Sequence, residues 1–141
     1  MIEGAHHYGV TVSDLDRSIA FYQDTLGLEV SITDRLEGEG IGQQVGLEGT
    51  ILKLAHLNVE GCLLELLEYE QPKGGNRNPE TANNDVGAAH FCIEVSNIND
   101  LYAELEDDVE FLSEPATLEN GAVGVYLLDP DRNPLELLEL P

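Results

Sequence analysis

Alternating bulky and small side chains at the start of the chain predict a β-strand. The bulky residues Tyr8, Val10 and Val12 alternate with smaller ones, so one face of the strand is apolar and the other is small or polar. We expect the bulky face to pack against helices. His7 lies on the other face, where small neighbours leave room for a side chain that points into a cavity.

An apolar stripe at helical spacing follows this strand and ends at Gly27, which predicts an amphipathic helix. We expect Ser13 to cap the helix, with Asp16 three residues later as in a capping box. The stripe consists of Leu15, Ile19, Tyr22 and Leu26.

The same strand and helix pattern begins again at residue 90. Residues 7–16 read HYGVTVSDLD and residues 90–99 read HFCIEVSNIN, with Ser96 or Asn97 as the expected second cap. The sequence LELLE occurs at 64–68 and again at 135–139. The chain therefore contains an internal repeat.

Each predicted helix is followed by three strand-like segments, so each repeat reads β-α-β-β-β. These segments are 28–34, 50–58 and 61–69 in the first repeat, and 109–112, 122–128 and 134–140 in the second. We expect an α+β fold in one domain over 1–141, with modules at about 5–70 and 88–140 joined by 71–87. Modules of this size are marginal alone, so they are expected to share a sheet or core.

The repeat places ionisable residues at equivalent positions in both modules: His7, Glu65, His90 and Glu136. Two imidazoles and two carboxylates are a ligand set for one borderline divalent ion, such as Ni, Zn, Co, Mn or Fe.

Other residues near these positions are expected to have structural roles or to lie at the surface. His6 and His56 have no counterpart in the other module and are expected to be structural or exposed. Glu68 and Glu139 follow the ligand positions by three residues, face the other side of the strand and are assigned to the acidic surface. Cys62 and Cys92, which lie in apolar segments, are expected to be buried thiols.

Two segments outside the repeat pattern are rich in turn-forming residues. Residues 35–50 contain five glycines, which predicts either a mobile loop over a site or a plain surface loop. In the connection 71–87, Lys73 and Arg77 are two of only six cations. We favour a solvated linker there; the alternative is that these cations meet an anionic group of a substrate.

The chain carries 28 acidic residues against two Lys and four Arg, a formal net charge of −22. Such a field repels nucleic acid phosphates and anionic lipid surfaces, so we expect neither partner. It indicates a host with high internal salt, a halophile, because salt screens repulsion between carboxylates. The N-terminal residues show no signal-peptide pattern, and no apolar run reaches 18 residues, so a cytoplasmic location is expected.

The segments 7–28 and 129–137 resemble the vicinal oxygen chelate superfamily, which includes glyoxalase I, methylmalonyl-CoA epimerase, extradiol dioxygenases and bleomycin-resistance proteins. The resemblance implies paired β-α-β-β-β modules whose curved mixed sheets wrap around one divalent metal ion per site. It implies the ligands His7, Glu65, His90 and Glu136. Members of this length are commonly homodimers.

The implied activity is that of a metal-dependent, glyoxalase I-like (lactoylglutathione lyase-like) lyase or isomerase. A metal-chelated enediolate or enolate forms while a carboxylate, Glu65 or Glu136, moves a proton between adjacent carbons. The substrate would be a hemithioacetal, a thioester or another small compound with vicinal oxygens. Three alternatives stay open: a methylmalonyl-CoA epimerase-like isomerase, an extradiol ring-cleaving dioxygenase, and a non-catalytic, resistance-type binding protein.

Some positions depart from the family pattern. Relatives with epimerase activity often carry Gln where Glu65 stands, which favours the glyoxalase-like reaction. The positions that hold glutathione in bacterial glyoxalase I are Thr11 and Tyr69 here, so the thiol part of the substrate is left open. Glu94, on the face of His90, is an additional acidic residue without a counterpart.

Overall fold

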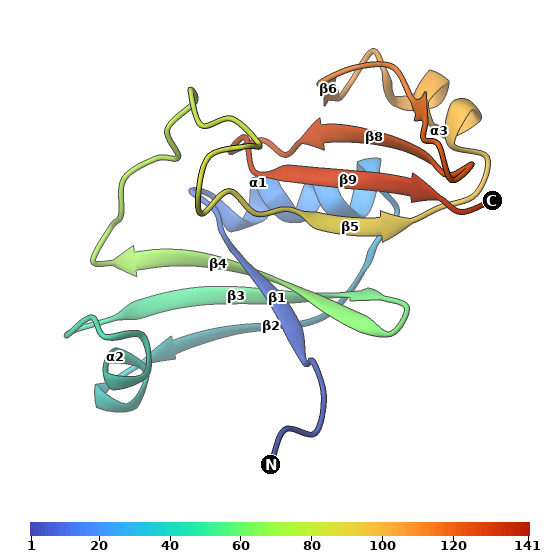
Figure 1. The fold of residues 1–141 in the computed structure, drawn as a ribbon. Helices are drawn as coiled ribbons and strands as arrows, with labels where there is room; N and C mark the ends of the chain where they lie inside the picture. Colours follow the sequence, from blue (N-terminus) through green and yellow to red (C-terminus); the bar gives the residue numbers. More distant parts are fainter. The chain divides into compact units, whose positions relative to one another are not determined.

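A computed structural model describes all residues 1–141, which divide into two compact units (Figure 1). The first unit is Met1–Asn76 and the second is Arg77–Pro141.

The first unit is a four-stranded sheet in the order β1-β4-β3-β2, with a helical segment after β1. The first strand pairs parallel with β4, whereas β3 pairs antiparallel with both β2 and β4. The elements are β1 (His7–Thr11), α1 (Leu15–Ala20), the π-helical turn η1 (Phe21–Thr25), β2 (Glu29–Glu37), α2 (Glu39–Val45), β3 (Ile51–Val59) and β4 (Cys62–Gln71).

The second unit repeats this topology, with the sheet order β5-β9-β8-β6. Its first strand pairs parallel with its last strand, as in the first unit. The elements are β5 (Phe91–Glu94), α3 (Ile98–Leu105), β6 (Glu110–Phe111), β7 (Ala116–Thr117), β8 (Val123–Leu128) and β9 (Pro134–Glu139). Both units follow the predicted β-α-β-β-β order with one addition each: α2 lies between β2 and β3, and the two-residue strand β7, paired with β8, lies between β6 and β8. The predicted α+β fold with curved mixed sheets is confirmed.

Each unit buries an apolar face of its sheet beneath its helix. Side chains that alternate along the strands supply most of this core, as the period of two requires. The buried residues include Tyr22, Ala55, Leu57, Leu64 and Leu66 in the first unit, and Ile98, Leu105, Val125, Leu127, Leu135 and Leu137 in the second.

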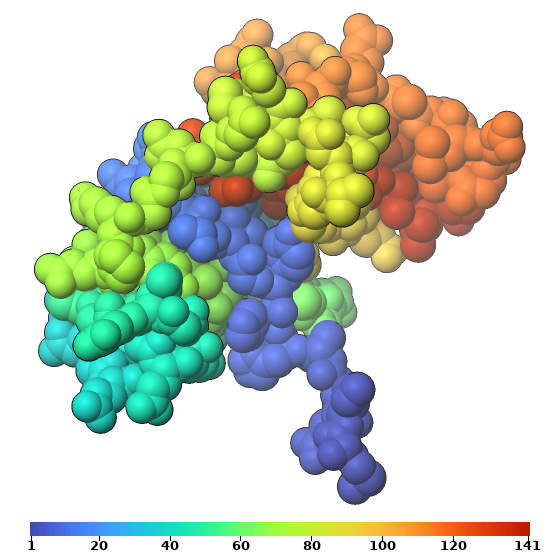
Figure 2. Space-filling model, turned by 60° about the vertical axis from the view of Figure 1, so that its left-hand side comes forward, coloured from blue at the N-terminus to red at the C-terminus, as the bar shows by residue number.

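The glycine-rich segment 35–50 is not a loop throughout, which corrects one expectation. It contains the end of β2 and the helix α2, and it lies at the surface of the first unit, cyan to teal in Figure 2. Gly42 is buried, and a Cβ there would lie 3.0 Å from the Leu47 carbonyl oxygen, so only glycine fits without a shift. Gly46 ends the helix in the left-handed conformation, with φ of 72°.

The first backbone amide of α1 and that of α3 each donate to a glutamate on the last strand of their unit. The backbone amide of Leu15 donates to Glu68 Oε2 at 2.8 Å, and that of Ile98 donates to Glu139 Oε2 at 2.7 Å. The assignment of both glutamates to the acidic surface was therefore wrong. Each carboxylate accepts from a helix N-terminus, where negative charge is favoured.

The parallel pairing of first and last strands brings these groups together. After β1 the amide of Val12 donates to the Leu67 carbonyl at 2.8 Å, and after β5 the amide of Val95 donates to the Leu138 carbonyl at 2.9 Å. The next residue on each last strand is the capping glutamate.

The side-chain caps also differ from the sequence expectation. Asp14, and not Ser13, is the N-cap of α1, and its side chain accepts from the Arg17 amide at 3.0 Å. Asn97, one of the two residues expected to cap α3, does occupy its N-cap position, in the left-handed conformation with φ of 56°, but its side chain makes no capping hydrogen bond.

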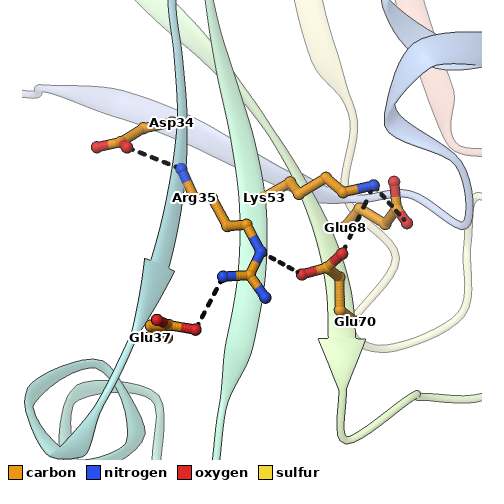
Figure 3. Close-up of polar contacts among 6 residues, drawn as sticks. All are labelled: Asp34, Arg35, Glu37, Lys53, Glu68 and Glu70. Atoms are coloured by element: carbon orange, nitrogen blue, oxygen red, sulfur yellow. Dashed lines mark hydrogen bonds and ion pairs between the residues drawn. The ribbon is translucent and has the colours of Figure 1, made fainter.

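Two of the six cations pair with carboxylates across β2, β3 and β4 (Figure 3). Arg35 Nε lies 2.7 Å from Glu70 Oε2, and Lys53 Nζ lies 3.8 Å from Glu70 Oε1 and 3.5 Å from Glu68 Oε1. Arg35 also pairs with Glu37 at 2.8 Å. Glu68 thus joins this cluster to the start of α1.

None of the helices in the structure has the length and apolar character needed to cross a membrane.

Candidate functional site

Two of the four predicted ligands are neighbours in the first unit. His7 Nε2, at the start of β1, lies 3.3 Å from Glu65 Oε2 on the adjacent strand β4. The glutamate side chain is 13 % exposed and the histidine 38 %. Gly9 is the register partner of Glu65, and its missing side chain leaves space beside the carboxylate. The pair is therefore accessible from solvent through the imidazole.

A third residue, His56, joins this pair and was missed as a site residue. Its Nε2 lies 2.8 Å from Glu65 Oε1, and its side chain is 16 % exposed. Each oxygen of Glu65 thus faces a different imidazole. The signal was in the sequence, because the two-residue turn Glu60-Gly61 fixes the β3–β4 register and sets residue 56 opposite residue 65.

His6 extends the group of histidines at the edge of the sheet. Its Nδ1 lies 2.8 Å from Nδ1 of His7, so one ring donates this hydrogen bond and the other accepts it. His6 is exposed, as expected from the sequence.

The other two predicted ligands are neighbours in the second unit. His90 Nε2, one residue before β5, lies 3.0 Å from Glu136 Oε2 on β9. Their side chains are 39 % and 18 % exposed, close to the values of the first pair. The sequence repeat therefore corresponds to a repeated His–Glu contact.

Tyr126 is the counterpart of His56 in the second unit. It lies opposite Glu136 in the β8–β9 register, as His56 lies opposite Glu65 in the β3–β4 register. Its hydroxyl is 3.2 Å from His90 Nε2. Burial, followed by the negative charge of Glu136, raises the pKa of Tyr126. The phenol therefore stays protonated at neutral pH and can donate a hydrogen bond.

Cys92 lies beside the second pair and is exposed, so the expectation of a buried thiol was wrong for it; Cys62 is half-buried. Cys92 is the register partner of Glu136. Partial desolvation, followed by the negative charge of Glu136, raises the pKa of the Cys92 thiol to about 11. The sulfur is therefore a neutral thiol at physiological pH.

The spacing of donor atoms within each unit suits a metal ion. Two ligands bound at about 2.1 Å with an angle between 90° and 109° lie roughly 3.0–3.4 Å apart. The His–Glu distances of 3.3 Å and 3.0 Å fall in this range. No three His, Cys, Asp or Glu side chains are grouped as a complete metal site. Each unit therefore supplies one imidazole and one carboxylate, and the four-residue site stays a prediction.

The remaining residues of interest occupy exposed or half-buried strand positions. Glu94 ends β5 and is exposed, on the same strand face as Cys92. Thr11 ends β1 and is exposed, whereas Tyr69 is half-buried on the face of β4 that carries Glu65. None of these three side chains takes part in either His–Glu contact.

Comparison with known sequences finds two kinds of epimerase among the relatives. The chain is 29 % identical to 2-epi-5-epi-valiolone epimerase from Actinomyces sp. over 146 residues, covering 96 % of this chain and 79 % of that protein. It is 31 % identical to mitochondrial methylmalonyl-CoA epimerase from Bos taurus over 129 residues, covering 89 % of this chain and 66 % of the bovine protein.

Comparison with solved structures finds the same fold. A glyoxalase family protein from Bacillus cereus matches with a TM-score of 0.87 at 21 % identity, covering 100 % of this chain and 97 % of the other. Lactoylglutathione lyase from Agrobacterium tumefaciens matches with a TM-score of 0.63 at 23 % identity, covering 98 % and 94 %.

The sequence profile of one family matches residues 4–137, nearly the whole chain. That span contains the first module, nearly all of the second and all four predicted ligands. The chain belongs to the Glyoxalase/Bleomycin resistance protein/Dioxygenase superfamily.

Proposed function

We propose that the protein is a metal-dependent isomerase or lyase that moves a proton next to a carbonyl group of a small substrate. The observation that carries this proposal is the repeated contact between His7 and Glu65 in one unit and His90 and Glu136 in the other. These four side chains would hold one divalent ion of the Ni, Zn, Co, Mn or Fe type. A bound ion supplies Lewis-acid stabilisation of negative charge on a substrate oxygen.

The carboxylates Glu65 and Glu136 are the proposed acid–base groups. For epimerisation, one carboxylate would take a proton from the carbon beside the carbonyl and the other, in its acid form, would deliver a proton to the opposite face of the same carbon. For the lyase reaction, the carboxylate that takes the proton would return it to the adjacent carbon. His56 fixes one oxygen of Glu65 at 2.8 Å, which leaves the other oxygen directed toward His7. The Tyr126 hydroxyl contacts His90, so it orients the imidazole of the second pair.

Epimerisation is the reaction that the comparisons favour within this class. The relatives include two kinds of epimerase, which are 29 % and 31 % identical to this chain over 96 % and 89 % of its length. Thr11 and Tyr69 occupy the positions that would hold glutathione, and neither is charged. We therefore place an acyl thioester or a related carbonyl compound first as substrate.

A glyoxalase I-like lyase is the second candidate. Glu65 supports it, since a carboxylate stands where epimerase relatives often carry Gln. The solved lactoylglutathione lyase with the same fold is consistent with it. A ring-cleaving dioxygenase is less favoured because four protein ligands leave fewer open positions for oxygen and catechol. A non-catalytic binding protein would need no metal.

One NMR experiment separates these reactions. Protein purified in high salt is analysed for metal, reconstituted with each candidate ion and incubated in D₂O with methylmalonyl-CoA or with the hemithioacetal of methylglyoxal and glutathione. Epimerisation exchanges the proton on the carbon next to the thioester without changing the carbon skeleton. Lyase activity converts the hemithioacetal to a thioester. Oxygen uptake with a catechol would instead identify the dioxygenase.

Two variants make the outcome specific to the proposed residues. Glu136→Gln removes one carboxylate and should abolish exchange and weaken metal retention. Glu104→Gln changes an exposed glutamate of α3 and should have neither effect. If the wild type stays empty of every ion and exchanges no proton, the proposal is wrong.

We further propose that the protein is a cytoplasmic homodimer. Light scattering at high salt tests the oligomeric state.

A further inference from the structure

A cavity in the second unit differs in charge from the rest of this acidic protein. It has a volume of about 310 Å³ and contains two of the six cations, Arg77 and Arg132. Its other lining residues are neutral: Pro79, Thr81, Ala82, Asn83, Leu112, Leu128 and Pro134. By contrast, the cavity of about 750 Å³ beside α2 is lined by Glu37, Glu39 and Glu48.

The cavity lies on the same sheet face as the second His–Glu pair. Leu128 and Pro134 line it, and they are register partners on β8 and β9. Two residues along the same strands stand Tyr126 and Glu136, also partners. Side chains two residues apart share a face, and the step along the strand is roughly 7 Å. A substrate held at Glu136 could therefore extend into the cavity.

The walls of the cavity are built by hydrogen-bonded turns. The segment after Arg77 is folded by the Glu80 amide, which donates to Asn78 Oδ1 at 3.0 Å, and by the Ala82 amide, which donates to Asp85 Oδ2 at 2.8 Å. Figure 1 shows this segment, yellow-green, beside the turn between β8 and β9 that carries Arg132.

Arg132 occupies a backbone position that favours glycine. Its φ is 66°, in the left-handed region, which is unfavourable for a residue with a Cβ. The turn itself is fixed by Asp129, whose Oδ1 accepts from the amides of Asp131 and Asn133 at 2.9 Å and 2.7 Å. The backbone conformation therefore gives no reason for an arginine at this position. The guanidinium group, by contrast, lines the cavity.

Glu110 orients this guanidinium without using all its donors. Arg132 Nη1 lies 2.7 Å from Glu110 Oε2, and the side chain of Arg132 is 44 % exposed. A guanidinium has five N–H donors, so donors remain for a second anion.

We infer that Arg77 and Arg132 form a subsite for an anionic group, phosphate or carboxylate, at the end of the substrate distant from the reacting carbon. This rests on the proposed function, which places the reaction at Glu136. The net charge of −22 repels anionic compounds in general, so a local pair of arginines is what such a substrate needs. Coenzyme A offers phosphates and glutathione offers carboxylates, so either can supply this group.

Calorimetric titration with free coenzyme A and with glutathione tests the subsite without turnover. The variants are Arg77→Gln, which removes one cation, and Arg132→Gly, which removes the other at a backbone position that glycine tolerates. Arg17→Gln is the matched control, because it makes the same change of net charge on the exposed surface of α1.

We expect one of the two compounds to bind the wild type and Arg17→Gln equally. Its affinity should fall about 10-fold in each cavity variant, as expected for losing one charged hydrogen bond. The compound that binds identifies the source of the anionic group. Unchanged affinity in both cavity variants, or saturable binding of neither compound, overturns the inference. Because calorimetry needs no reaction, failure of the proton-exchange assay leaves this result interpretable.

Discussion

His56 lies opposite Glu65 in the β3–β4 hairpin, and its Nε2 is 2.8 Å from Glu65 Oε1. The equivalent position in the second unit is Tyr126, opposite Glu136. The two units thus share the His–Glu contact but differ in the neighbour that orients it. In the first unit His56 contacts the carboxylate of Glu65. In the second unit the Tyr126 hydroxyl contacts the imidazole of His90.

Removing the His56 contact should weaken metal binding without unfolding the protein. In His56→Phe the ring volume is kept, but one oxygen of Glu65 loses its partner, so the carboxylate is less well oriented. Loss of such an orienting partner costs about 10- to 100-fold in metal affinity or activity. Competition titration with a chromophoric chelator measures the change in affinity, and thermal unfolding measures the change in stability.

Asn58→Ala is the matched control for this prediction. Asn58 is exposed and lies two residues from His56 on the same strand, β3. We expect metal affinity within a few-fold of the wild type. If His56→Phe binds metal as tightly as the wild type does, His56 has no orienting role.

The sequence repeat was enough to predict the topology and to single out the four residues that form the two His–Glu contacts. Alternating and helical periodicities depend on local spacing alone, so β1, α1, β4 and β9 were found close to their observed bounds. The equivalence of His7 with His90, and of Glu65 with Glu136, followed from matching segments and not from knowledge of distances.

Features that depend on pairing between distant strands were missed. His56 needed the register of a hairpin, and the caps by Glu68 and Glu139 needed the parallel pairing of first and last strands. The helix α2 was missed for another reason. Its segment contains five glycines, which have low helix propensity, and Gly42 is required there by close packing against a carbonyl.

The two capping glutamates should contribute measurably to stability. Glu68→Ala and Glu139→Ala each leave a helix amide without its carboxylate, at a helix end where negative charge is favoured. We expect each change to lower the free energy of unfolding by about 1 kcal/mol, as measured by urea titration at pH 7. Glu68→Ala should have the larger effect, because Glu68 also pairs with Lys53.

Two further variants control this experiment. Glu104→Ala removes an exposed carboxylate of α3 and should change stability by no more than about 0.5 kcal/mol. Glu139→Gln keeps an oxygen acceptor and should lose less than Glu139→Ala. Equal losses in Glu104→Ala and Glu139→Ala would show that the carboxylate-to-amide contact adds no stability.

The thiol of Cys92 should react slowly with iodoacetamide although the residue is exposed. Its pKa is raised from 9.0 to about 11, so the neutral thiol is favoured and the thiolate fraction at pH 8 falls roughly 100-fold. Mass spectrometry of Cys62→Ser protein follows Cys92 alone, with the urea-unfolded chain as reference. The rate should rise toward the reference as pH passes through about 11.

Glu136→Gln tests the cause of this protection. It removes the negative charge beside the sulfur but keeps a side chain of similar size, so the Cys92 pKa should fall and alkylation should accelerate. Desolvation is the larger cause and stays in place, so the rate should remain below that of the unfolded chain. Alkylation at the unfolded rate in the wild type would contradict the raised pKa.

Salt should stabilise the protein by screening its own charge. The chain carries 28 carboxylates against six cations, and at about 1 M salt the screening length is only about 3 Å, which removes most repulsion between separated carboxylates. We expect the melting temperature to rise by several degrees between about 0.1 M and 2 M KCl. The variant Glu104→Lys/Glu119→Lys changes the net charge from −22 by four at exposed positions, so its melting temperature should rise less steeply with salt. If the melting temperature rises equally steeply with salt in the wild type and the variant, the stabilisation comes from salting-out of apolar surface and not from screening of charge.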